Sequence, residues 1–123
     1  MITIIDDDAG ARDSLRVLLQ CAGLDARTFA SCDDFVAAGA GDEEDCLILD
    51  IQMRGMTGLE LLEHLRQRGN DLPVILVSAR PPRDVVARAE KAGAIALLSK
   101  PFKAVELLGL IRNVLERRTP ELC

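Results

Sequence analysis

Short aliphatic segments alternate five times with longer segments of helical periodicity along this chain of 123 residues. The aliphatic segments have the length of strands, and most are apolar on both faces, as in parallel strands covered by helices on either side. This alternation predicts an α/β fold, a doubly wound (βα)5 parallel sheet with helices on both faces. The expected strands are residues 2–5, 25–30, 46–49, 73–77 and 95–98.

The second expected strand, residues 25–30, is the most polar of the five, which predicts a place at an edge of the sheet. Two helix starts carry the S/T-x-x-D/E capping signal: Ser31 with Asp34, and Thr57 with Glu60. The glycines expected to close helices in the left-handed conformation are Gly23, Gly69 and Gly93. In the last helix we expect a core stripe of Ala104, Leu108, Ile111 and Leu115, flanked by Leu107 and Val114.

Composition narrows the function classes. With 15 Lys and Arg against 20 Asp and Glu, the net charge is -5, which disfavours direct binding to nucleic acid or to acidic membrane surfaces. We expect a cytoplasmic protein with no membrane segment. Residues 1–117 are expected to form one domain and residues 118–123 a polar tail, and the sequence leaves open whether this tail starts a linker to an effector domain or ends the protein. No C-x-x-C pair occurs, so we expect reduced cysteines that serve as packing residues, with Cys123 exposed; the others are Cys21, Cys32 and Cys46.

Acidic residues follow two of the expected strands. Asp6 and Asp7 come after the first strand, and Asp50 comes after the third. If these strands are neighbours, the carboxylates converge at the sheet edge where α/β proteins bind ligands, and a divalent cation such as Mg²⁺ would offset their repulsion. The alternative is that Asp6, Asp7 and Asp8 only begin a helix, because acidic residues favour helix N-termini.

Ser78 and Lys100 follow the fourth and fifth expected strands. Lys100 precedes Pro101, and a cis bond there would turn the lysine side chain over the sheet edge. Carboxylates, a hydroxyl and an ammonium group, together with Mg²⁺, are suited to phosphoryl transfer onto a carboxylate. We interpret His64 as an ordinary helix residue.

The chain resembles the receiver (CheY-like) domain of bacterial two-component response regulators over nearly its whole length. The resemblance rests on Ile4-Ile5-Asp6-Asp7-Asp8, on Leu49-Asp50-Ile51-Gln52-Met53 with Gly58, on Val77-Ser78-Ala79 and on Lys100-Pro101-Phe102. The stretch from Phe29 to Phe35 resembles the nitrogen-fixation-regulator (FixJ-like) branch. The resemblance implies a flavodoxin-like fold, a five-stranded sheet of strand order 2-1-3-4-5.

The resemblance also implies a role for each site residue. Asp50 would accept the phosphoryl group, with Mg²⁺ held by Asp7, Asp50 and the Gln52 carbonyl directly and by Asp6 through water, and with Ser78 and Lys100 binding phosphoryl oxygens. The donor would be a sensor histidine kinase, and the chain would catalyse only its own phosphorylation and dephosphorylation. Phosphorylation would switch the surface of the fourth helix, fifth strand and fifth helix, where Leu97 and Val105 could form a homodimer patch, and so control an output such as transcription.

Three features depart from the family pattern. Arg54 stands where proline is usual, and Leu97 replaces an aromatic residue, so no aromatic side chain can report activation there. Ser78 replaces threonine and lacks the methyl group that restricts its rotamer. The segment Arg80-Pro81-Pro82 is stiff, which predicts a smaller displacement on activation.

Two other functions stay open on the sequence alone. A haloacid-dehalogenase-type phosphatase would use Asp6 as nucleophile and Asp8 as acid, but it would leave Asp50 without a role. A degenerate receiver would act only as a protein-interaction module and would not bind Mg²⁺.

Overall fold

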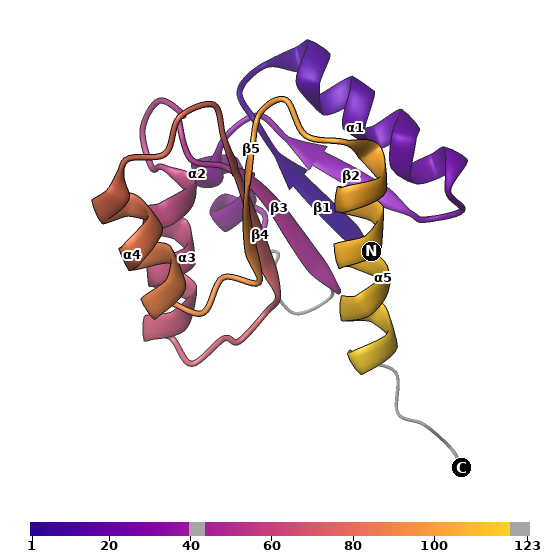
Figure 1. The fold of residues 1–123 in the computed structure, drawn as a ribbon. Coiled ribbons are helices and arrows are strands. Elements are labelled where there is room, and N and C mark those ends of the chain that lie inside the picture. Colours follow the sequence, from indigo (N-terminus) through magenta and orange to yellow (C-terminus); the bar gives the residue numbers. More distant parts are fainter. Residues whose placement is uncertain (40–43, 119–123) are drawn as a thin grey trace.

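The computed structural model describes residues 1–39 and 44–118 and contains a five-stranded parallel sheet (Figure 1). The strand order is β2-β1-β3-β4-β5, which confirms the fold class and the edge position of the polar second strand. The strands are β1 (Ile2–Ile5), β2 (Ala26–Phe29), β3 (Cys46–Asp50), β4 (Val74–Ser78) and β5 (Ala96–Ser99).

Helices cover both faces of the sheet. In Figure 1, α1 and α5 lie on one face, and α3 and α4 lie on the other. Each face has its own buried aliphatic cluster, one formed with α1 and α5 and one formed with α2, α3 and α4. The helices are α1 (Ala9–Cys21), α2 (Cys32–Ala37), α3 (Gly58–Gln67), α4 (Arg83–Lys91) and α5 (Ala104–Arg118).

The predicted helix signals are confirmed. The Ser31 hydroxyl accepts a hydrogen bond from the Asp34 amide, and Thr57 and Glu60 form a complete capping box at the start of α3. The three predicted glycines follow α1, α3 and α4 with positive φ. Because these contacts lie within a few residues of one another, the local sequence is enough to specify them.

The buried stripe of α5 is rotated from the predicted one: of its four predicted members only Ile111 is buried, and Leu115 is partly buried. Leu107, Ile111 and Val114 are fully buried, whereas Leu108 is only partly buried and Ala104 is exposed. Apolar side chains cover a broad arc of this helix, so several rotations would each bury a plausible stripe. The way α5 packs on the sheet selects one of them.

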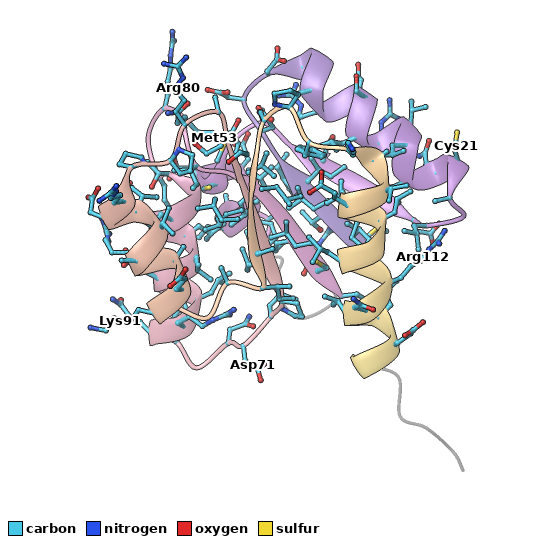
Figure 2. The ribbon with its side chains drawn as sticks, in the orientation of Figure 1. Cys21, Met53, Asp71, Arg80, Lys91 and Arg112 are labelled. Carbon is cyan, nitrogen blue, oxygen red and sulfur yellow. The ribbon has the colours of Figure 1, made fainter. Side chains whose placement is uncertain are left out.

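The cysteines do not all pack inside. Cys32 and Cys46 are buried as expected, and burial raises the pKa of the Cys32 thiol to about 12. Cys21 is exposed, so the prediction was wrong for this residue, which lies at the outer end of α1 (Figure 2). The predicted exposure of Cys123 lies outside the described residues.

No helix within residues 1–39 and 44–118 is long and apolar enough to cross a bilayer. Helix α5 continues to Arg118, one residue into the predicted tail.

Arg66 connects the end of α3 with the end of α4 through hydrogen bonds. Its guanidinium donates hydrogen bonds to the carbonyl oxygens of Ala92 (2.8 Å), Asn70 (2.9 Å) and Gly93 (3.4 Å). Carbonyl groups at helix C-termini lack partners within the helix, so one side chain supplies donors to both ends.

Arg66→Met is expected to lower the free energy of unfolding by about 2 kcal/mol, because hydrogen bonds from a charged donor contribute about 1.5–3 kcal/mol. Urea denaturation followed by circular dichroism measures this loss. The matched control is Arg68→Met, at an exposed position on the same helix end, with an expected change within about 0.5 kcal/mol. Equal losses of unfolding free energy in the two variants would contradict a stabilising role for the hydrogen bonds of Arg66 to the two helix ends.

Candidate functional site

The carboxyl ends of neighbouring strands meet at one edge of the sheet. β1 pairs with β3, and β3 pairs with β4, so Asp6, Asp50 and Ser78 lie at the ends of adjacent strands. Asp50 and Ser78 are the last residues of their strands rather than the first residues of the loops. Figure 2 shows Met53 and Arg80, from the loops after β3 and β4, at this edge.

Lys100 reaches over this edge and joins two buried carboxylates. Its Nζ lies 2.9 Å from Asp50 Oδ2 and 3.4 Å from Asp6 Oδ2. Asp6 is 3% exposed and Asp50 is 8% exposed. The peptide bond between Lys100 and Pro101 is cis, as the sequence suggests. The structure thus brings together three side chains far apart in the sequence, while their chemical roles stay predictions.

Backbone amides hold the other oxygen of each carboxylate. The Asp8 amide donates to Asp6 Oδ1, and the Gln52 amide donates to Asp50 Oδ1, each at 2.9 Å. Both Oδ2 atoms are left to face Lys100. The two carboxyl groups are therefore oriented by the loops that follow their own strands.

The site has an excess of negative charge. Burial raises the pKa of the Asp6 carboxyl and the charge of Asp50 raises it further, whereas the Asp8 amide and Lys100 lower it. Burial opposes the charged form of Lys100, yet the hydrogen bonds and charges of Asp50 and Asp6 raise its pKa overall. One ammonium group therefore serves two carboxylates, a donor set whose charge a divalent cation would offset.

The expected Mg²⁺ ligands are not all gathered at one point. Within residues 1–39 and 44–118, no group of three or more His, Cys, Asp and Glu side chains has metal-binding geometry. Asp7 is exposed, and Lys100 bridges Asp6 and Asp50. Two buried carboxylates suit Mg²⁺ chemically, but the full ligand set stays a prediction.

Ser78 carries an unusual hydroxyl group. The residue is 1% exposed, and its Oγ is buried without a hydrogen-bond partner in the part of the chain that the structure describes. Buried polar atoms are normally hydrogen-bonded, so an unsatisfied hydroxyl at a strand end is suited to receiving a ligand atom.

A cleft of about 430 Å³ borders the site. Asp6, Asp50 and Lys100 line it together with apolar side chains of α1 and α5, among them Leu15 and Leu18. The carboxylates are therefore buried in the fold but adjoin open space.

Residues 2–112 match the response regulator receiver domain family. The chain belongs to this family. Its resemblance to that family is thereby confirmed, and the receiver domain covers the whole sheet and most of α5.

The receiver domain has relatives among transcriptional regulators. It is 39% identical to the transcriptional regulatory protein TdiR of Thauera aromatica, over 93% of this chain and 50% of TdiR. It is 32% identical to the transcriptional regulatory protein FixJ of Bradyrhizobium diazoefficiens, over 97% of this chain and 58% of FixJ. The solved structure of the response regulator StyR superposes with a TM-score of 0.86 at 36% identity, covering 94% of this chain and 59% of StyR. The chain spans about half the length of the curated relatives it matches.

Two departures from the family pattern, Arg54 and Leu97, and two residues expected to affect activation, Pro82 and Val105, occupy different environments in the receiver domain. Arg54 is exposed in the loop after β3, whereas Leu97 is partly buried against the cluster beneath α3 and α4. Val105 on α5 is 79% exposed. Pro82 is the N-cap of α4 and provides no side-chain hydrogen bond. Their effects on switching stay predictions.

Two further residues of the receiver domain shape the site. Gly58 packs against the end of β3, where an added Cβ would lie 2.5 Å from the Asp50 carbonyl oxygen; the sequence suggests it only through the family resemblance. Arg12 is a site residue that was not predicted from the sequence; its Nη1 donates a hydrogen bond to the Asp6 carbonyl oxygen at 2.7 Å. The available signal was a cation in the first turn of a helix, where the helix dipole disfavours it.

Proposed function

We propose that this receiver domain accepts a phosphoryl group on Asp50 from a sensor histidine kinase and thereby controls an output such as transcription. The observation that carries the proposal is the position of Asp50. Its carboxylate lies 2.9 Å from Lys100 Nζ at a strand end, next to the strand that ends at Ser78, whose hydroxyl has no hydrogen-bond partner among the described residues.

The transfer is a displacement at phosphorus. A carboxylate oxygen of Asp50 forms a bond to phosphorus as the bond from phosphorus to the imidazole nitrogen of the donor breaks, and that nitrogen keeps the electron pair. Mg²⁺, held by Asp6, Asp7, Asp50 and the Gln52 carbonyl, would supply charge neutralisation for the phosphoryl oxygens. Lys100 contributes a fixed positive charge beside the reacting carboxylate.

The acyl phosphate would then change the local contacts. Ser78 Oγ would donate to a phosphoryl oxygen, and Lys100 would exchange its bond to the Asp50 carboxylate for one to the phosphoryl group. Because a ligand shifts an equilibrium only through its differential affinity for two states, these new contacts must favour an altered position of the loop after β4. We propose that α4, β5 and α5 transmit the change, with Leu97 and Val105 in a phosphorylation-promoted homodimer.

Intact mass spectrometry with acetyl phosphate and MgCl₂ tests the function. We expect the mass to increase by one phosphoryl group, and we expect no increase when EDTA removes the metal before acetyl phosphate is added. A degenerate receiver would bind no Mg²⁺ and show no gain, which would contradict the proposal.

The phosphatase alternative is tested separately. Turnover of p-nitrophenyl phosphate that is lost in Asp6→Asn but kept in Asp50→Asn would favour it. The structure offers no support for the acid that this mechanism needs, because the Asp8 carboxylate caps α1 by accepting a hydrogen bond from the Ala11 amide.

A further inference from the structure

Arg12 contacts the backbone immediately before Asp7. Its guanidinium donates to the Asp6 carbonyl oxygen at 2.7 Å, and the residue is partly buried in the first turn of α1. A cation at this end of a helix is opposed by the helix dipole, so the stability of α1 does not explain the residue. The contact with the loop between β1 and α1 is a better explanation.

The Asp6 backbone is held on both sides. Its amide donates to the Phe29 carbonyl of β2 at 3.2 Å, and its carbonyl accepts from Arg12. Because a peptide unit is planar, fixing the Asp6 carbonyl also fixes the direction of the Asp7 amide and Cα. Arg12 therefore contributes to fixing how the chain leaves β1 toward Asp7, together with the bond from the Asp8 amide to Asp6 Oδ1.

We propose that Arg12 is a positioning residue that orients Asp7 for Mg²⁺ and so strengthens Mg²⁺ binding. The inference rests on the proposed function in one respect, since Asp7 is a Mg²⁺ ligand only in that scheme. It concerns the geometry of the loop and assigns Arg12 no contact with the phosphoryl group.

The direction of the change in Mg²⁺ affinity distinguishes a positioning role of Arg12 from a purely electrostatic one. Arg12→Met removes a positive charge near a cation site, which by Coulomb interaction alone would strengthen Mg²⁺ binding. Loss of positioning weakens it instead. We expect a dissociation constant for Mg²⁺ about tenfold higher in Arg12→Met, the size of effect found when residues that orient metal ligands are replaced.

Isothermal titration calorimetry with MgCl₂ alone measures the dissociation constant for Mg²⁺. We choose calorimetry because the chain has no Trp or Tyr to serve as a fluorescent probe. The matched control is Arg16→Met, one turn further along α1, where the arginine forms a surface ion pair with Asp13 at 3.4 Å. Surface ion pairs contribute little, so we expect its dissociation constant within about twofold of wild type. Arg12→Lys keeps a donor of similar reach and should recover part of the affinity.

Phosphorylation by acetyl phosphate gives a second readout. In Arg12→Met the Mg²⁺ concentration for half-maximal rate should rise about tenfold, while the rate at saturating Mg²⁺ stays near wild type. A purely structural role would instead lower the free energy of unfolding without Mg²⁺ and leave the dissociation constant of the folded protein unchanged.

Unchanged or tighter Mg²⁺ binding in Arg12→Met overturns the inference, as does wild-type protein that binds no Mg²⁺. If Arg12→Met does not fold, the comparison of Arg12→Lys with Arg16→Met decides: equal dissociation constants overturn the inference, and a higher one for Arg12→Lys supports it. Tenfold tighter Mg²⁺ binding by wild type than by Arg12→Met supports the role of Arg12 even if Asp50 gains no phosphoryl group, a result that would contradict the proposed function alone.

Discussion

Asp50→Asn is expected to reduce phosphorylation by acetyl phosphate at least about 1000-fold, because replacing a nucleophile removes the bond-forming step itself. The carboxamide can still accept the hydrogen bond that the Gln52 amide donates at 2.9 Å, so the loop after β3 should keep its conformation. The loss would therefore report chemistry rather than unfolding. Intact mass after a fixed incubation with acetyl phosphate and MgCl₂ provides the measurement.

Asp13→Asn is the matched control. Asp13 is exposed on α1 and pairs with Arg16, away from the carboxylates that Lys100 joins. Its phosphorylation should equal that of wild type. A phosphoryl group that persists in Asp50→Asn, or that maps to another residue in the wild-type protein, would remove Asp50 from the proposed role.

Gly58→Ala is expected to cost about 2–3 kcal/mol of unfolding free energy, the upper part of the range of about 1–3 kcal/mol for overpacking. An added Cβ would lie 2.5 Å from the Asp50 carbonyl oxygen and 3.1 Å from Leu49 Cβ. The nearest atom belongs to the backbone, so no side-chain rotation can relieve the clash, and either α3 or the end of β3 must move. The melting temperature should fall by roughly 10 °C.

The same variant should slow phosphorylation, because displacing the Asp50 carbonyl disturbs the residue that carries the reacting carboxylate. Gly109→Ala on α5 is the control: a Cβ there has no neighbour within 4 Å, and alanine favours helix over glycine by about 1 kcal/mol. We expect that variant to be as stable as wild type or slightly more so. Wild-type stability in Gly58→Ala would show that α3 does not need its close approach to β3.

The strands and helix starts could be predicted because their causes are local. Uniform aliphatic runs specify the buried strands β1, β3 and β4, and the polar second run specifies an edge, but the aliphatic run of β5 forms the other edge and is only partly buried. The capping box of Thr57 and Glu60 spans four residues and forms as those residues dictate. The meeting of Asp6, Asp50 and Lys100 could also be predicted, since the carboxyl ends of parallel strands share one edge of a sheet.

Other features depend on contacts between segments that are distant in the chain. The buried stripe of α5 centres on Ile111 with Leu107 because docking on the sheet selects one of several apolar arcs. Cys21 is exposed because this last residue of α1 lies on the side of the helix that faces solvent. Nothing in the local sequence shows that Arg66 bonds two helix ends or that Arg12 reaches the Asp6 carbonyl.

Hydrophobic pattern and capping chemistry thus suffice for the order of elements, the layered sheet and the strand ends that carry the acidic residues. Those signals act over a few residues, where side-chain type alone determines the preferred conformation. Tertiary packing decides how closely Gly58 approaches Asp50 and which way the chain turns toward Asp7. These features depend on contacts between residues of different helices and strands. Such contacts form only when the helices pack on the sheet.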